Sequence, residues 1–131
     1  MPADAQTGTV PKGKAMVFVE EDVAHIAFSG ITIRIGVDGK WVGATTNLTY
    51  IGFPVEPGVH HLCVSVQGLA MGKLENGITL RALEAKAGET YYIRVRETQG
   101  QAPPLVFVDM VDADEGQLLL QTMAAAAWRV K

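Results

Sequence analysis

The sequence predicts a mainly β protein, an antiparallel β-sandwich of about seven or eight strands followed by a C-terminal α-helix. Apolar and polar residues alternate along short runs, turn-forming residues separate the runs, and the apolar period lengthens near the C-terminus. Alternation is typical of strands, because successive side chains point to opposite faces, and the longer period is typical of helices. Many short strands at this spacing favour a sandwich or barrel over a βαβ fold.

The alternating runs predict which side chains face the core. The apolar positions expected to point inward are Met16 and Phe18; Ile31, Ile33, Ile35 and Val37; Leu62, Val64 and Val66; Ile78, Leu80 and Ala82; Tyr91, Ile93 and Val95; Val106, Val108 and Met110. The positions between them hold Thr32, Arg34, His61, Ser65, Thr79, Arg81, Tyr92, Arg94 and Arg96. We therefore expect each strand to have one packed and one wet face.

Turn chemistry stands where strands are expected to stop. The turns are Asp38-Gly39, Glu56-Pro57-Gly58, Glu75-Asn76-Gly77 and Ala87-Gly88. Since Asp and Gly both tolerate positive φ, the first of these predicts a tight hairpin. It joins the strand 31–37 to the segment 41–43.

The C-terminal segment predicts a helix over about residues 113–128. Asp112 is placed to cap it, and Glu115 follows at the capping-box spacing. Its apolar stripe consists of Leu119, Leu120, Met123, Ala124, Ala127 and Trp128. Residues 1–14 are rich in small and polar residues and predict a flexible N-terminal arm. Residues 15–131 then form a single β-sandwich domain.

Composition restricts the class of protein. The 131 residues are 48% hydrophobic, enough for one independent core. With 14 acidic and 11 basic residues, the formal charge of −3 lacks the basic excess that nucleic acid requires, so we predict no nucleic-acid partner. No apolar run approaches the roughly 20 residues that span a bilayer, so we predict no transmembrane segment. The lone cysteine, Cys63, excludes an internal disulfide.

Four ordered motifs carry a resemblance to a family. They are Gly36-Val-Asp-Gly-Lys-Trp-Val-Gly43, Val55-Glu-Pro-Gly-Val-His-His-Leu-Cys63, Ala87-Gly-Glu-Thr-Tyr-Tyr-Ile-Arg-Val95 and Val111-Asp-Ala-Asp-Glu-Gly116. Together they resemble the bacterial DUF2846 family over about residues 15–120, with a weaker similarity to PEGA-type domains. The resemblance implies a secreted, periplasmic or lipoprotein-like β-sandwich of unknown function, and no active site. Similar members pair the His-His-Leu-Cys motif with a second cysteine in the N-terminal arm, which this sequence lacks.

Cys63 and His61 are the first candidate site. Cys63 is out of phase with Leu62 and Val64, so it shares the face opposite the core with His61. A nucleophilic thiol needs a base and an orienting partner, and the sequence marks no third member. An ordinary thiol, or half of a lost disulfide, explains Cys63 equally simply.

Metal sites are not predicted. His60 and His61 are adjacent on a strand, so they point to opposite faces and cannot easily hold one ion together. A site that adds His25 and Asp109 is conceivable, but a loop histidine and ordinary strand residues explain the pattern. The acidic residues at the helix start, Asp112, Asp114 and Glu115, suit capping and the helix dipole, and are too few for a calcium loop.

Arginines on the wet positions are the second candidate site. The set that can converge on an anionic ligand is Arg34, Arg81, Arg94 and Arg96, with Tyr92 beside them. The alternative is a solvated face on which these arginines pair with Glu84, Glu89 or Glu97. Trp41, Tyr50 and Phe53 can form a binding platform or plug one end of the sandwich.

The sequence therefore predicts a non-catalytic module that interacts with an envelope protein or with itself. We expect it to be extracytoplasmic, periplasmic or envelope-attached, with a signal segment absent from this sequence. No catalytic residue, metal or cofactor is predicted. The predicted ligand-binding residues are Arg34, Arg94, Arg96, Tyr92, His61 and Cys63. The alternative is a small-ligand binder or weak hydrolase that uses the face with Cys63, His61 and the arginines.

Overall fold

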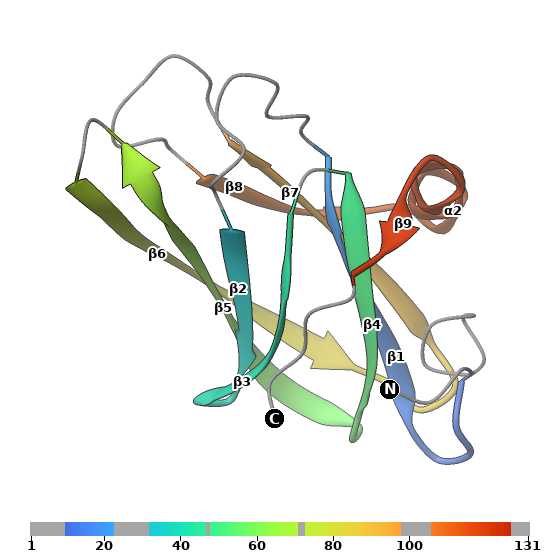
Figure 1. Cartoon of the computed structure of the whole chain (residues 1–131). Coiled ribbons are helices and arrows are strands. Elements are labelled where there is room, and N and C mark those ends of the chain that lie inside the picture. Colours follow the sequence, from blue (N-terminus) through green and yellow to red (C-terminus); the bar gives the residue numbers. More distant parts are fainter. Residues whose placement is uncertain (1–9, 23–31, 47, 71–72, 98–105, 127–131) are drawn as a thin grey trace.

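Two stacked β-sheets and one helix make up the fold (Figure 1). The computed structural model describes residues 10–22, 32–46, 48–70, 73–97 and 106–126. These residues contain nine strands and one α-helix. The predicted mainly β sandwich with a C-terminal helix is confirmed. Most of the predicted N-terminal arm lies outside the described residues, as do Ile31 and Trp128.

Sheet A has five strands in the order β8-β7-β1-β4-β9. They are β1 (Ala15–Glu21), β4 (Thr49–Val55), β7 (Thr90–Glu97), β8 (Val106–Val111) and β9 (Ala124–Ala125). The central strand β1 pairs antiparallel with β4 and parallel with β7. The sheet is therefore mixed, and its centre joins segments that are far apart in the chain.

Sheet B has four antiparallel strands in the order β3-β2-β5-β6. They are β2 (Thr32–Val37), β3 (Lys40–Thr45), β5 (Gly58–Ala70) and β6 (Lys73–Ala85). The predicted tight hairpin between β2 and β3 is confirmed, because Val37 pairs with Lys40 across two turn residues. Asp38 and Gly39 both have positive φ, at 52° and 84°, which is the requirement of a type I′ turn.

The main core lies between the two sheets. Its buried members include Val17, Val19, Ile33, Ile35, Ile51, Leu62, Val64, Leu83, Ile93, Val95 and Val108. The inward positions predicted for the strands β2, β5 and β7 are confirmed where the structure describes them, with Tyr91 partly buried against this core. On β8, Val108 is buried and Val106 partly buried, but the prediction for Met110 was wrong, because its side chain is 39% exposed.

Strand β1 is buried on both faces, which differs from the prediction. Val17 and Val19 belong to the core, whereas Met16 and Phe18 point to the other side of sheet A, where they form a second cluster with Tyr92. The Phe18 and Tyr92 rings stack with centroids 5.6 Å apart. The prediction for Met16 and Phe18 was wrong about the face, because a helix covers the side of the sheet that was expected to be wet.

Strand β6 also differs from the prediction. The expectation that Ile78, Leu80 and Ala82 face inward was wrong, and Leu83 and Ala85 are buried instead. Apolar residues occur in both phases of this run, so alternation alone does not determine the inner face. The pairing with β5 determines it: Leu62 lies opposite Arg81, and inward residues pair with inward residues. Arg81 reaches across to donate a hydrogen bond to the Val108 carbonyl, at 3.4 Å.

Helix α2 (Ala113–Gln121) is shorter than the predicted helix over residues 113–128. Its last turn closes with hydrogen bonds from the Thr122 N–H and hydroxyl to the Leu119 carbonyl. The chain then extends, and the N–H groups of Ala124 and Ala126 donate to carbonyls of the β4 region. Pairing with β4 thus overrides the helix propensity of the alanines.

The start of α2 differs from a capping box. Asp112 occupies the N-cap, but its side chain makes no capping hydrogen bond. Asp114 instead accepts the N–H of Glu115 at 2.9 Å. The acidic residues of this turn still suit the positive end of the helix dipole.

Gly116 is the point of closest approach between α2 and sheet A. A Cβ at this position would lie 2.2 Å from Cγ of Tyr92. The Gln117 amide also donates to the Tyr92 hydroxyl, at 3.4 Å. The absence of a side chain at Gly116 therefore lets the helix rest on the Tyr92 ring.

We predict that Gly116→Ala destabilises the domain by about 1–3 kcal/mol, because the new methyl group overpacks the contact with Tyr92. Urea unfolding measures the change. Gln121→Ala, at an exposed position of the same helix, is the control and is expected to stay within about 0.5 kcal/mol of the wild type. Equal unfolding midpoints for Gly116→Ala and the wild type would contradict this packing.

Candidate functional site

The predicted ligand-binding residues lie on two different surfaces. Arg34, His61 and Cys63 belong to the outer face of sheet B, on strands β2 and β5. Arg94, Arg96 and Tyr92 belong to the outer face of sheet A, on β7. The core separates the two faces, so the six residues do not form one site. Arg81 belongs to neither set, because it points to the inner side of β6.

Helix α2 and two ion pairs engage the predicted residues on the outer face of sheet A. Helix α2 covers Tyr92, which is buried and is not on a wet face. Arg94 forms a short ion pair with Asp22, with its Nε 2.7 Å from the carboxylate. Arg96 contacts Asp109 at 3.3 Å. Both arginines are thus paired, with aspartates rather than with the predicted Glu84, Glu89 or Glu97.

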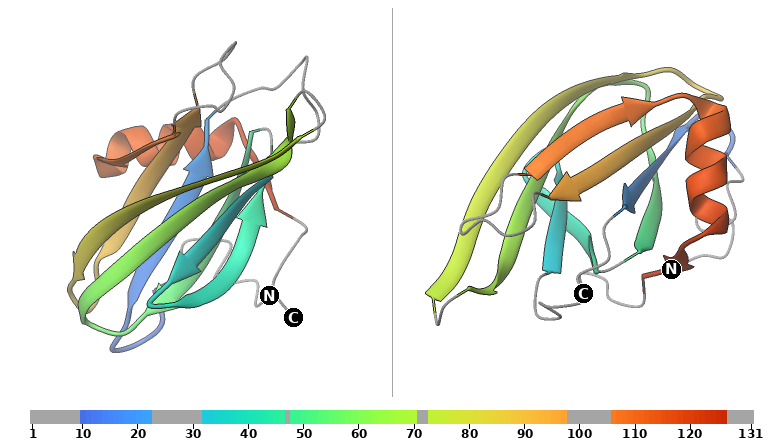
Figure 2. Two further views of the ribbon diagram at one scale, coloured as in Figure 1. Left: turned by 90° about the vertical axis from the view of Figure 1, so that its left-hand side faces the viewer. Right: turned by 90° about the horizontal axis from the view of Figure 1, so that it is seen from above.

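Among the described residues, no helix lies on the outer face of sheet B. Figure 2 (left) shows its strands towards the viewer, with α2 on the far side of the molecule. Three large apolar side chains lie exposed on it: Val59 at 61%, Ile78 at 64% and Leu80 at 73%. Leu80 lies directly opposite Cys63, and Ile78 lies opposite Ser65. These residues continue the face that begins at Arg34 and Trp41.

Arg34 and Trp41 form a stacked pair on this face. The guanidinium carbon of Arg34 lies 4.1 Å from the centroid of the Trp41 ring. The ring lies against Gly36, where a Cβ would be 3.1 Å from a ring carbon. Gly36 therefore leaves the space that the Trp41 ring occupies, and the ring in turn holds the guanidinium. Of the three aromatic residues expected to form a platform or a plug, Trp41 stacks with Arg34, Phe53 is a core residue and Tyr50 contacts Phe18 edge-on.

Cys63 and His61 share this face, as the sequence predicts. Cys63 is a partly exposed free thiol. The His61 side chain is 73% exposed. Its ring Nδ1 lies 3.9 Å from one carboxylate oxygen of Asp38, and its backbone N–H donates a hydrogen bond to the same oxygen at 2.8 Å. No described contact joins the His61 ring to the Cys63 sulfur. The hydrolase interpretation thus stays a prediction without support from these contacts.

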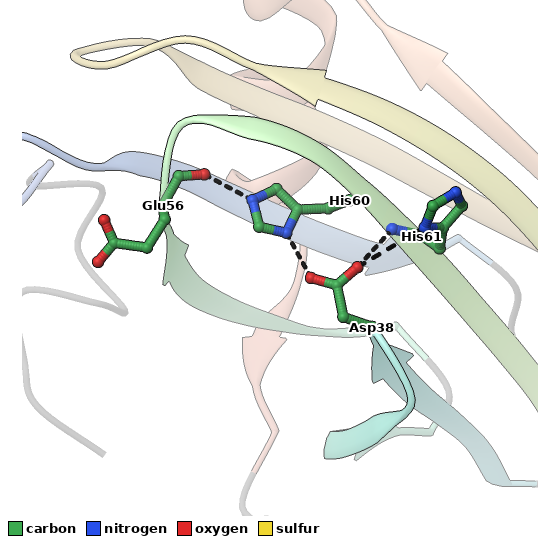
Figure 3. Close-up of polar contacts among 4 residues, drawn as sticks. All are labelled: Asp38, Glu56, His60 and His61. Carbon is green, nitrogen blue, oxygen red and sulfur yellow. Dashed lines mark hydrogen bonds and ion pairs between the residues drawn. The ribbon is translucent and has the colours of Figure 1, made fainter.

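His60 clamps two turns together at the end of the sandwich (Figure 3). Its Nδ1 lies 2.5 Å from the Asp38 carboxylate, in the β2–β3 turn, and its Nε2 lies 2.5 Å from the Glu56 carbonyl, in the β4–β5 turn. Both partners only accept hydrogen bonds, so both ring nitrogens donate and the ring is the charged imidazolium. As predicted, His60 and His61 point to opposite faces, with 14% and 73% of their side chains exposed.

The clamp changes two pKa values in opposite directions. The hydrogen bond to Asp38, followed by that to Glu56, raises the pKa of His60. The hydrogen bonds from His60 and from the His61 backbone lower the pKa of Asp38. The His60 contribution to stability is lost as pH rises through its raised pKa, and the Asp38 contribution is lost as pH falls through its lowered pKa. The clamp is therefore strongest in mildly acidic solution.

We predict that Asp38→Asn lowers the pKa of His60 from its wild-type value, because the asparagine cannot carry the charge that stabilises the imidazolium. NMR titration of the histidine ring protons measures it. The chain has three histidines, so His25→Gln and His61→Gln assign the other two signals, and His61→Gln is expected to leave the His60 titration nearly unchanged. If Asp38→Asn also leaves the pKa of His60 unchanged, the ion pair between the His60 imidazolium and the Asp38 carboxylate is contradicted.

Glu20 is a second unusual titrating group, on the helix-covered side of sheet A. Its side chain is fully buried, and neither carboxylate oxygen has a hydrogen-bond partner. Burial and, next, the charge of Asp22 raise its pKa from 4.5 to about 8, with Arg94 opposing the change. Glu20 is therefore mostly protonated at neutral pH. Sequence alternation did not single it out, since nothing in the sequence shows that β1 is covered on both faces.

We predict that Glu20 makes the domain less stable as pH rises from 5 to 8. The folded protein holds the proton more tightly than the unfolded chain, so the free energy of unfolding falls, by roughly 3 kcal/mol over this range. Glu20→Gln is expected to flatten the profile and to be more stable than the wild type at pH 8. Chemical unfolding at each pH measures it, with the exposed Glu84→Gln as the control. Parallel profiles for Glu20→Gln and the wild type would contradict the assignment.

The acidic cluster at the start of α2 consists of Asp112, Asp114 and Glu115. Their carboxylate oxygens lie within 4.8 Å of one another, and all three side chains are exposed. Such clusters are common without a bound ion. The prediction of no metal site stays untested.

No protein-family model matches the chain, and the search of curated proteins finds no match. The DUF2846 resemblance therefore stays a prediction. In the described part of the chain, no helix is long and apolar enough to span a membrane.

Proposed function

We propose that this domain is a non-catalytic binding module that holds a partner protein on the outer face of sheet B. The observation that supports this proposal is the exposure of Ile78 and Leu80 beside the stacked pair of Arg34 and Trp41, with Val59 farther along the same face, which no described helix covers. Contiguous exposed apolar residues rimmed by polar ones are typical of interaction surfaces. Trp and Arg are also enriched among the residues that dominate binding energy.

The energetics fit a partner of moderate affinity. Burying an exposed Val, Leu or Ile side chain contributes about 1.5–3 kcal/mol. Three such side chains must offset the loss of translational and rotational freedom on association, which costs at least about 4 kcal/mol. The apolar residues alone therefore support weak binding, and further contacts at Arg34 and Trp41 are needed for a specific complex.

The predicted place of this interaction is the cell envelope, outside the cytoplasm. This part of the proposal depends on the DUF2846 resemblance alone. Fractionation of cells that produce the tagged full-length protein tests it. Recovery in the periplasmic or envelope fraction supports the proposal, and recovery with cytoplasmic markers contradicts it.

We predict that peptides selected for binding to the wild-type domain lose at least about tenfold in affinity when Leu80 is changed to Thr. Leu80→Thr removes apolar area but keeps a residue suited to a strand. The probe is a phage-displayed library of random peptides, and fluorescence anisotropy of the enriched peptides gives the affinity.

Leu118→Gln is the matched control for this test. Leu118 is exposed to a similar extent, at 62%, but lies on α2. Its substitution is expected to leave the affinity unchanged. The proposal fails if no peptide is enriched, or if the enriched peptides bind Leu80→Thr as tightly as the wild type.

A further inference from the structure

We infer that the partner presents a carboxylate to Arg34, next to apolar side chains that cover Ile78 and Leu80. The inference rests on the proposed function, because it names the kind of partner that the outer face of sheet B would hold. It specifies a peptide segment in which an acidic residue stands close to aliphatic or aromatic residues. A basic partner would not meet this description.

Arg34 is held in place but has no acidic partner. Its guanidinium stacks on Trp41, and no ion pair or hydrogen bond of its side chain is found among the described residues. The other described arginines differ: Arg94 pairs with Asp22, Arg96 pairs with Asp109, and Arg81 donates to a carbonyl. Stacking leaves the edge of the guanidinium free, and this edge presents paired N–H donors that match a carboxylate.

The charges around Arg34 favour an acidic partner. The neighbouring outward positions on β5 and β6 hold Ser65 and Ile78, then Cys63 and Leu80, none of them acidic. Among the described residues, Glu84 is the acidic side chain on this face of β6, and it lies opposite Val59. Val59 is six residues from Ser65 along β5, roughly 20 Å away. The described residues around Arg34 therefore include no carboxylate that would neutralise it.

The strand spacing sets the distance between the two parts of the proposed contact. Arg34, Ser65 and Ile78 lie side by side on three adjacent strands. Adjacent strands are about 4.8 Å apart, so the backbones at Arg34 and Ile78 are separated by about 10 Å. A short peptide segment spans this distance with an acidic residue at one end and an apolar residue at the other.

The experiment uses the peptides enriched on the wild-type domain and, for each, a twin in which every Asp and Glu is replaced by Asn or Gln. On the wild type, the twin is expected to bind at least about tenfold more weakly. In Arg34→Gln, peptide and twin are expected to bind equally, because the charge that distinguishes them is gone. Arg34→Lys is expected to restore only part of the difference, since an ammonium group lacks the planar paired donors.

Arg96→Gln is the matched control, because Arg96 also lies near an aromatic ring but belongs to sheet A. It is expected to leave the difference between peptide and twin unchanged. Equal binding of peptide and twin to the wild type, in peptides that still require Leu80, overturns the inference and leaves the binding face in place. Failure to enrich any peptide that requires Leu80 overturns the proposed function itself, and the inference with it.

Discussion

The burial of β1 on both faces is the constraint on which the rest of the structure depends. β1 lies between β4 and β7, and every one of its residues from Ala15 to Glu21 is buried. One face completes the core between the sheets, and the other requires a second cover. Helix α2 supplies that cover through the contact of Gly116 with Tyr92. The described helix lies against sheet A, and no described helix covers the outer face of sheet B.

This asymmetry separates structural polar groups from available ones. On sheet A, Arg94 and Arg96 are paired with aspartates, and Glu20 is buried and keeps its proton at neutral pH. At the end of the sandwich, both ring nitrogens of His60 hydrogen-bond to turn residues. Arg34 stands apart from these groups on sheet B, stacked on Trp41 beside exposed apolar residues. The arginines of sheet A thus stabilise the fold through ion pairs, whereas Arg34 on sheet B has no ion pair among the described residues.

The sequence was sufficient for the fold class, for the β2–β3 hairpin and for the inner faces of β2, β5 and β7, because each depends on local chemistry or on a single clear alternation. It was insufficient wherever tertiary contacts decide. β6 has apolar residues in both phases, so only the register with β5 shows that Leu80 faces out. The early end of α2 depends on pairing of Ala124 with β4, which local helix propensity opposes.

For the candidate site, the sequence correctly placed His61 and Cys63 on one face, but it joined Arg34 with Arg94 and Arg96. Alternation shows that these side chains point away from the core, but it does not show which of the two sheets carries each of them. Trp41 was recognised only as a possible platform, because its stacking with Arg34 depends on the space above Gly36. The sequence also missed the exposure of Ile78 and Leu80, because β6 has apolar residues in both phases and its inner face could not be assigned.

The most direct test of the account is the solvent exposure of methyl groups, measured by NMR line broadening with a soluble gadolinium chelate at low protein concentration. The account predicts strong broadening of the Ile78 and Leu80 methyl signals, while those of Val17 and Ile93 stay protected. Protection of Ile78 and Leu80 to the same degree as the core methyls would show that the outer face of sheet B is covered. That result would contradict the central claim that this face is free to bind a partner.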